Sequence, residues 1–267
     1  MNMYRSDHWM RSCNRPPFIM GILNVTPDSF SDGGRFLSKD DALAHAFELI
    51  DDGADIIDIG GESTRPGSDP TSLEEELSRV IPVIEELSAS SDVPISIDTM
   101  KPEVAERSLA AGASIINDIC GIRDERMADV VLKNDANVII MHMHGTPKTL
   151  GTDIMGNDFM NEIKGFLDER AAYLIERGLD SRNVILDPGV GFGKDAEQNM
   201  RIIMNSGWFS DKYPVLIGPS RKRFLTNNFP DMERDEATLK ASDLAVKSGA
   251  SILRVHNVKK AVSHFKE

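Results

Sequence analysis

Three polar residues lie at or near the carboxyl ends of short apolar runs, where they could act together on a ligand. They are Asp98, Asn117 and Asp187. A lone carboxylate is costly to bury, so each aspartate needs a polar partner. Two carboxylate acceptors and one amide suit a flat heterocycle that carries amino and ring N–H groups. The competing interpretation is structural, with each aspartate capping the helix that follows it.

A second group of residues could converge on one anion. Asn24, Arg65, Arg254 and His256 lie in or directly after the first, second and eighth apolar runs. Arginine suits bidentate contact with phosphate oxygens. Arg254 and His256 are two positions apart, so on a strand they share one face. The competing interpretation is that the arginines form separate surface salt bridges.

Ser220, Arg221 and Lys222 follow a Gly-Pro pair where the chain is predicted to enter a helix. A helix N-terminus presents unpaired N–H groups and a positive dipole to a carboxylate or phosphate. Lys222 could act as a Schiff-base lysine, as an anion ligand or as a hydrogen-bond donor to a ring. These three roles stay open at the level of the residues themselves.

The glycine-rich segment 187–194 lacks the glycine spacing and the Lys-Ser/Thr ending of a Walker motif. We expect its glycines to let the backbone approach a flat ligand, with Phe192 beside it. His142 and His144 would share one face of a strand, but no cysteine or carboxylate stands at matching spacing, so we do not predict a transition-metal site. Met141 is expected to be a packing residue.

The apolar runs alternate with helix-like stretches along the whole chain. Near-continuous apolar strands separated by helices indicate a parallel sheet buried on both faces. We therefore predict an α/β fold, a single-domain (β/α)8 TIM barrel, in which the active site lies at the C-terminal rim of the strands. Residues 16–267 would form the catalytic domain and residues 1–15 a loose N-terminal tail. The predicted strands are 18–25, 55–61, 93–99, 114–120, 137–143, 184–190, 214–220 and 251–257.

Local signals mark where the predicted helices begin and end. Thr71 with Glu74 reads as a capping box. Glycines are expected to end helices where the chain adopts left-handed geometry, and they stand at positions 53, 112, 178 and 249. Two long polar loops, 24–34 and 60–68, follow the first two strands, and long loops on a compact domain are often functional.

The bulk composition excludes several functional classes. The 267 residues carry a formal net charge of −13, which argues against nucleic-acid or anionic-membrane partners. Two cysteines cannot form a disulfide framework, so a reducing cytoplasm is the expected location. No apolar stretch approaches the roughly 20 residues of a membrane span, and the N-terminus lacks the apolar region of a secretory signal.

Together, these segments resemble the dihydropteroate synthase family of pterin-binding enzymes. The similarity runs from about Phe18 to Val258. It rests on the segments 21–34, 60–67, Ile97-Asp98-Thr99, Ile116-Asn117-Asp118, Met141-His142-Met143, 186–194, Ser220-Arg221-Lys222 and Arg254-Val255-His256.

The resemblance implies an activity and a set of partners. The family joins 6-hydroxymethyl-7,8-dihydropterin pyrophosphate to p-aminobenzoate, using Mg²⁺, and releases pyrophosphate. Departure of pyrophosphate would leave a cation stabilised by the pterin, which the aniline nitrogen then attacks. The resemblance also implies a homodimer and sulfonamides as inhibitors.

The resemblance also implies roles for individual residues. Asn24, Arg65, Lys222, Arg254 and His256 would be the catalytic residues. Asn24 would bind Mg²⁺, and it would bind the pyrophosphate with Arg65, Arg254 and His256. The implied pterin ligands are Asp98, Asn117, Met141, Asp187, Phe192 and Lys222, and the implied p-aminobenzoate ligands are Phe30, Thr64, Pro66 and Ser220.

The chain departs from the family pattern around the rim. Asn257 stands where the family commonly has Asp, and Asp195 and Gln198 stand where Thr and His are more usual. These departures concern the residues around the predicted ligands.

Three other functions compete with this interpretation. A methyltetrahydrofolate-binding methyltransferase of the same superfamily would need no pyrophosphate site, so Arg65, Arg254 and His256 argue against it. A non-catalytic paralogue that only binds pterin would not need the two long loops. A Schiff-base aldolase would use Lys222.

Overall fold

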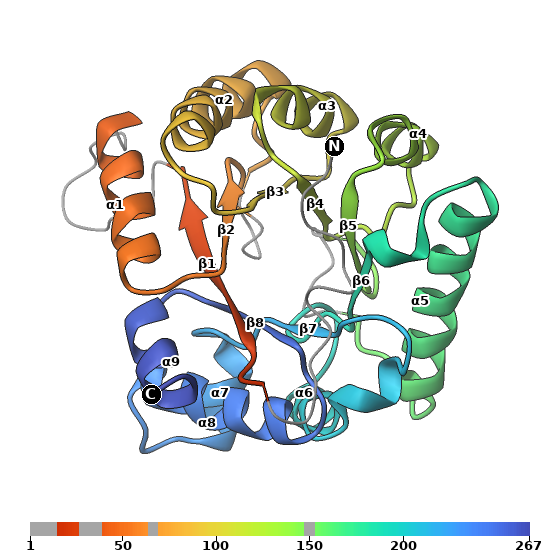
Figure 1. Cartoon of the computed structure of the whole chain (residues 1–267). Helices are drawn as coiled ribbons and strands as arrows, with labels where there is room; N and C mark the ends of the chain where they lie inside the picture. Colours follow the sequence, from red (N-terminus) through yellow and green to blue (C-terminus); the bar gives the residue numbers. More distant parts are fainter. Residues whose placement is uncertain (1–14, 27–38, 64–68, 147–152) are drawn as a thin grey trace.

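Eight parallel strands form a closed barrel inside a ring of helices, as a computed structural model of the chain shows (Figure 1). The structure describes residues 15–26, 39–63, 69–146 and 153–267. The strand order is β6-β5-β4-β3-β2-β1-β8-β7. A parallel bridge between Leu186 and Val215 joins the two ends of this order and closes the ring. The predicted (β/α)8 barrel is therefore confirmed.

The strands are shorter than the apolar runs that predicted them. The largest difference is at β7, which covers Leu216–Ile217 where the run extended over 214–220. Proline cannot donate to a sheet ladder, and Pro214 and Pro219 flank this strand on its two sides. The strands are β1 (Phe18–Asn24), β2 (Ile56–Gly60), β3 (Ile95–Asp98), β4 (Ile115–Asp118), β5 (Asn137–Met141), β6 (Val184–Asp187), β7 and β8 (Ile252–Val255).

The barrel interior has an apolar layer and, above it, a polar layer. Alternate residues of a strand point to the same face. One set of such residues forms a buried apolar cluster, which comprises Met20, Ile56, Ile115, Ile139, Ile185, Leu216 and Ile252. Two residues further along five of these strands stand Asp58, Asn117, Met141, Asp187 and Arg254. The apolar cluster therefore fills the barrel, and the polar chemistry starts one layer closer to the C-terminal rim.

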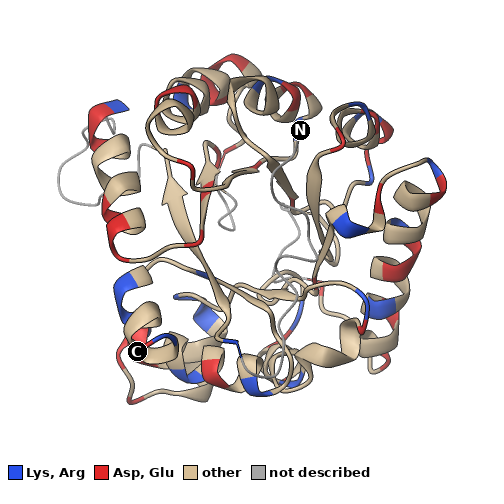
Figure 2. Ribbon diagram, viewed as in Figure 1, with Lys and Arg blue, Asp and Glu red and all other residues tan. Residues whose placement is uncertain are grey.

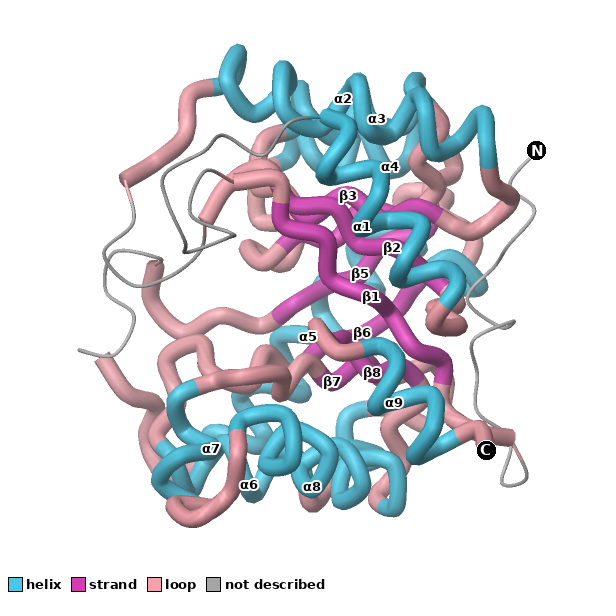
Figure 3. Tube along the Cα trace, turned by 90° about the vertical axis from the view of Figure 1, so that its left-hand side faces the viewer, coloured by secondary structure: helices cyan, strands magenta, loops and turns pink. Residues whose placement is uncertain are grey.

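Helices cover the outside of the strands, and Figure 3 shows the strands enclosed between them. A larger apolar cluster fills the space between strands and helices. Acidic and basic residues are interspersed along the outer helices (Figure 2). The helices are α1 (Lys39–Asp51), α2 (Leu73–Ser90), α3 (Pro102–Ala111), α4 (Glu125–Asn134), α5 (Phe159–Glu176), α6 (Ala196–Ile203), α7 (Arg223–Asn228), α8 (Arg234–Lys247) and α9 (Val258–Phe265). Across the described ranges, no helix combines the length and the apolar character that crossing a membrane requires.

The local signals at the helix ends were mostly informative. The glycines at 53, 112, 178 and 249 all have positive φ, between 93° and 120°. The predicted cap of α2 is wrong by one residue, because Ser72, not Thr71, accepts a hydrogen bond from Glu75 N at 3.2 Å. The amide of Thr71 donates instead to Glu62 Oε1 at 3.0 Å, so this residue belongs to the loop before the helix.

Candidate active site

Arg254 lies at the centre of the polar layer, between two carboxylates. Its Nε donates to Asp58 Oδ2 at 2.6 Å, and its Nη2 donates to Asp98 Oδ2 at 2.7 Å. Burial raises the pKa of Asp98 to about 7, a rise that Arg254 opposes and Asp58 reinforces. Arg254 was predicted to bind an anion and Asp98 to bind a ring, and the structure places the two in direct contact.

Asp58 is a site residue that the sequence reasoning missed. It lies in the middle of β2 and is fully buried. Asn117, from β4, donates its Nδ2 to both Asp58 oxygens at 3.3 Å. An aspartate inside an otherwise apolar run is itself a signal, because a buried carboxylate requires a partner.

Asp187 and Lys222 form a second polar pair near the glycine-rich loop. Burial raises the pKa of Asp187, and the nearby Lys222 opposes that rise. Burial likewise lowers the pKa of Lys222 to about 8, against the opposing effect of Asp187. Lys222 Nζ donates to the carbonyl of Val190 and lies 4.5 Å from the centre of the Phe192 ring. The structure thus brings the predicted residues Asp187, Phe192 and Lys222 together.

Lys194 holds the glycine-rich loop from inside, a role that the sequence did not indicate. Its Nζ lies 3.0 Å from His142 Nδ1 and donates to the carbonyls of His142 (3.0 Å), Gly189 (2.8 Å) and Phe192 (3.1 Å). Burial, followed by the charge of Lys194, lowers the pKa of His142 to about 2, so its imidazole is neutral. A Cβ on Gly189 would lie 1.9 Å from the carbonyl oxygen of His142, so only glycine lets the loop pack this closely.

The two histidines do not share a strand face as predicted. The strand ends at Met141, so both histidines belong to the loop that follows. His142 contacts Lys194, whereas His144 Nε2 lies 3.2 Å from Asp153 Oδ2. The two histidines share no strand face because the ladder between β5 and β6 ends where Met141 pairs with Asp187.

An apolar wall adjoins these polar groups. Ile119, Met141 and Met143 form a buried cluster, and Phe192 and Cys120 pack against it. Burial raises the pKa of the Cys120 thiol to about 12, so the thiol stays protonated at neutral pH. Met141 is thus a packing residue, as predicted, and its cluster lies next to Lys222 through Phe192.

Ser220 and His256 contact one another. Ser220 Oγ lies 2.9 Å from His256 Nδ1 and accepts a hydrogen bond from the amide of His256 at 3.2 Å. The expectation that Ser220 stands at a helix N-terminus is wrong, because α7 begins only at Arg223. The reason is Arg221, whose φ of 57° is incompatible with the first turn of a helix.

The residues that depart from the family pattern have local structural roles. Asp195 and Gln198 form a capping box at the start of α6. Asn257 Oδ1 accepts from Lys260 N at 3.0 Å, and its Nδ2 donates to Asp235 Oδ2 at 2.8 Å. These residues stabilise the helices behind the rim.

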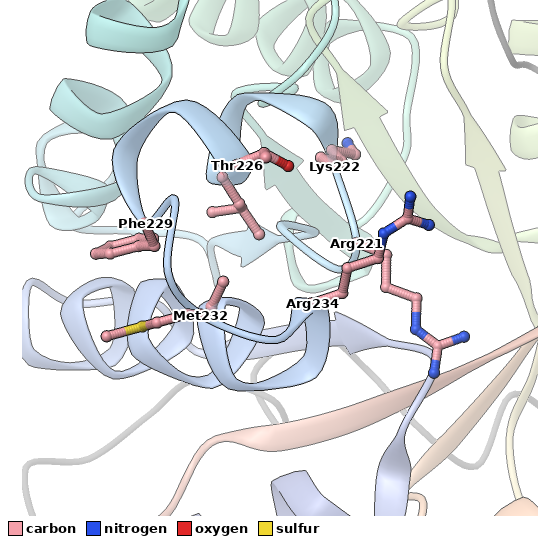
Figure 4. A pocket seen from close by; sticks show the side chains of 8 residues that line it. Arg221, Lys222, Thr226, Phe229, Met232 and Arg234 are labelled. Carbon is pink, nitrogen blue, oxygen red and sulfur yellow. The ribbon is translucent and has the colours of Figure 1, made fainter.

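A small pocket lies outside this rim, between α7 and α8 (Figure 4). Three cationic side chains lie toward one end of it, and Phe229 and Met232 lie toward the other. One of these cations is Lys222, so the pocket adjoins the site described above. Its lining comprises Arg221, Lys222, Leu225, Thr226, Phe229, Met232, Arg234 and Ala237.

Asn24 stands at the rim, next to Gly60 and Asp98. It pairs in register with Gly60 of β2. A Cβ added to Gly60 would lie 3.8 Å from Asn24 Oδ1 and 3.9 Å from Asp98 Oδ2, so both oxygens border the space that this glycine leaves free. Among the described residues, no group of three or more His, Cys, Asp or Glu side chains could hold a metal ion. A cation here would therefore depend on Asn24 and on oxygens brought by a ligand.

Four predicted site residues, Phe30, Thr64, Arg65 and Pro66, lie outside the described residues. The chain on either side of residues 64–68 is well anchored. Glu62 accepts from the amide of Thr71, and Glu62 Oε2 pairs with Lys101 Nζ at 2.6 Å. Arg79 Nη1 donates to the carbonyl of Gly61 at 2.7 Å. Gly61, Glu62 and Thr71, which flank the undescribed residues, are therefore fixed by hydrogen bonds.

Comparison with known proteins agrees with this geometry. Residues 20–256 match the pterin binding enzyme family. The chain is 49% identical to the dihydropteroate synthase of Bacillus subtilis over 245 residues, which covers 90% of this chain and 84% of that protein.

Solved structures give the same result. The dihydropteroate synthase of Clostridium difficile, solved in the presence of pteroic acid, has a TM-score of 0.87 and 42% identity, and covers 96% of this chain and 97% of its own. That of Yersinia pestis, in complex with a sulfonamide drug, has a TM-score of 0.85 and 38% identity, and covers 93% and 91%.

Proposed function

We propose how the barrel mouth works, from the premise that this chain belongs to the pterin-binding enzyme family and acts as a dihydropteroate synthase. It condenses 6-hydroxymethyl-7,8-dihydropterin pyrophosphate with p-aminobenzoate to give 7,8-dihydropteroate and pyrophosphate in folate biosynthesis. The observation that carries the residue assignments is the polar layer itself. Its carboxylates, amide and cations lie at the C-terminal rim, where barrel enzymes place their chemistry.

The pterin ring is bound by the innermost polar groups. Asp98, Asn117, Asp187 and Lys222 supply acceptors and donors to its edge. Two of these groups already form hydrogen bonds with other site residues. Asp98 accepts one from Arg254, and Asn117 donates one to Asp58. The buried face of the ring packs against Met141 and Phe192, which belong to the same apolar cluster.

The leaving pyrophosphate is bound at the outer side of this layer, by Asn24, Arg65, Arg254 and His256. As the C–O bond breaks, its electron pair goes to the pyrophosphate oxygen, and positive charge develops on the pterin. Preorganised cations stabilise that growing negative charge. The aniline nitrogen then forms the C–N bond and loses a proton to solvent, since the bonded nitrogen is strongly acidic.

Mg²⁺ fits this site through Asn24. Mg²⁺ commonly keeps several waters and takes few protein ligands, with phosphate oxygens completing its shell, and Asn24 Oδ1 lies at the rim beside Gly60. When bound, the ion supplies charge neutralisation on the pyrophosphate. Calorimetric titration of pyrophosphate with and without Mg²⁺ tests this assignment, because Asn24→Ala should remove the enhancement that Mg²⁺ gives to the wild-type protein.

The p-aminobenzoate carboxylate is bound at Ser220, with Phe30, Thr64 and Pro66 around the ring. The contact between Ser220 and His256 supports this assignment, because His256 is one of the proposed pyrophosphate ligands and the two substrates must meet. Sulfonamides, as mimics of p-aminobenzoate, would occupy the same place.

Two properties are proposed from family resemblance and composition, a homodimer in solution and a cytoplasmic location. Light scattering coupled to size-exclusion chromatography measures the first directly. A monomer at micromolar concentration would contradict it.

A pyrophosphate-release assay tests the proposed roles. The purified protein should release pyrophosphate from the pterin substrate over many turnovers when p-aminobenzoate and Mg²⁺ are present. Arg254→Ala should lower kcat by roughly tenfold or more, since a hydrogen bond to a charged group contributes about 1.5–3 kcal/mol. Binding of a phosphate-free pterin should change little, and a strong loss of that binding would place Arg254 with the ring.

A further inference from the structure

One buried carboxylate links the two halves of the site. Asp58 accepts from Arg254 Nε at 2.6 Å, and Asn117 Nδ2 lies 3.3 Å from each of its oxygens. In the proposed function, Arg254 binds the leaving group and Asn117 binds the ring. Asp58 itself is fully buried, whereas the Arg254 side chain is 19% exposed, so a ligand in the mouth meets Arg254 before it meets Asp58.

The guanidinium of Arg254 divides its contacts between two carboxylates of different burial. The Asp58 side chain is fully buried, whereas that of Asp98 is 14% exposed. Asp98 borders the open mouth and is itself a proposed pterin ligand. A ligand that engages Asp98 or draws on Nη2 can therefore replace the Asp98 contact while the Nε contact with Asp58 stays in place.

We propose that Asp58 is a positioning residue for the reaction. It anchors Arg254 by its Nε, so that the rest of the guanidinium can turn to the pyrophosphate. The same carboxylate orients Asn117 toward the pterin. This inference rests on the proposed role of Arg254. The rigid fork of the guanidinium makes the anchoring possible, because Nε and the terminal nitrogens point in fixed, different directions.

The sign of one measurement separates positioning from simple electrostatics. Asp58 is an anionic group beneath an anion site, so its negative charge alone opposes pyrophosphate binding. If charge were all that mattered, Asp58→Asn would tighten pyrophosphate binding. If Asp58 positions Arg254, the same substitution weakens it, because Asn offers an N–H where Arg254 or Asn117 needs an acceptor.

The experiment measures pyrophosphate affinity by calorimetry, together with kcat and KM, for Asp58→Asn and for the control Ser96→Ala. Ser96 is a buried residue paired in register with Asp58 on the neighbouring strand. We expect Asp58→Asn to weaken pyrophosphate about tenfold and to lower kcat by a similar factor, and Ser96→Ala to stay within twofold of the wild type. In the double variant that carries Arg254→Ala and Asp58→Asn, the loss in pyrophosphate affinity should exceed that of Arg254→Ala alone by less than twofold.

A second variant probes the anchor without touching the buried carboxylate. Arg254→Lys keeps the charge but removes the Nε donor, so it should lose pyrophosphate affinity to a similar extent as Asp58→Asn, even if the latter folds poorly. Wild-type affinity in Arg254→Lys, or equal or tighter binding in Asp58→Asn, would overturn the inference. If Arg254→Ala leaves pyrophosphate affinity unchanged, the proposed role of Arg254 fails and the role of Asp58 fails with it. If only Arg254→Ala weakens binding, the inference alone fails.

Discussion

Replacing Lys222 with methionine should weaken pterin binding. It should also remove the free-energy cost of burying the lysine charge in the folded protein. Burial lowers the pKa of Lys222 from 10.5 to about 8. Each pKa unit corresponds to ~1.4 kcal/mol, so the folded protein disfavours the charged lysine by at most ~3.5 kcal/mol. Solvent at this partly buried side chain reduces that figure, and we expect about 1–2 kcal/mol.

The free-energy cost of burying the charged Lys222 should depend on pH. The folded-state pKa lies below that of the unfolded chain, so the cost is present in full below pH 8 and is relieved as the pH rises toward 10.5. The wild-type protein should therefore gain stability relative to Lys222→Met between pH 7 and pH 10. The lost hydrogen bond to the Val190 carbonyl is common to both pH values and cancels from this comparison.

Urea unfolding of both proteins at pH 7 and pH 10 measures this difference, and calorimetry with a phosphate-free pterin measures binding at pH 7. The pterin should bind Lys222→Met about 10–100-fold more weakly, since a hydrogen bond from a charged donor contributes about 1.5–3 kcal/mol. Equal stability differences at the two pH values would refute the burial argument. Unchanged pterin affinity would refute the placement of the ring.

Three further substitutions test other parts of the site. Asp187→Asn should weaken pterin binding about tenfold or more, because the amide places a donor where the ring needs an acceptor, as calorimetry would measure. Ser220→Ala should weaken binding of a sulfonamide by a few-fold to tenfold while phosphate-free pterin affinity stays constant. Asn257→Asp should keep the helix cap but place a second carboxylate beside Asp235, which costs roughly 1 kcal/mol at pH 7 and less below pH 4, where the new carboxyl is protonated. Thermal or urea unfolding across that pH range would detect the last change.

The sequence predicted the fold well because parallel strands buried on both faces leave a clear pattern. Seven of the eight runs contribute one residue to the inner apolar cluster, the exception being the run 93–99, and every run contributes one or more residues to the outer cluster. The ends of the strands were predicted less well. They depend on where a neighbouring ladder stops, as at β7 (Leu216–Ile217), and the composition of a single run does not contain that information.

The candidate site was predictable where a polar residue closes an apolar run. Asp98, Asn117 and Asp187 gave this signal, and the structure places all three in or beside the polar layer. The contact between Asp58 and Arg254 gave none, because 196 positions separate the two residues and only closure of the barrel joins them. Lys194 was missed for a related reason, since three backbone carbonyls in the folded loops bind it.

The arrangement of charge in the mouth suits a reaction that separates charge. The carboxylates of Asp98 and Asp187 lie on the side proposed for the pterin, and burial raises the pKa of both. In the proposed mechanism, Arg254 leaves Asp98 when it turns to the pyrophosphate. That movement removes a cation from Asp98 at the stage when the pterin begins to carry positive charge. The developing cation then replaces the guanidinium beside this carboxylate, and the guanidinium faces the developing anion, so one short displacement prepares both ends of the breaking bond.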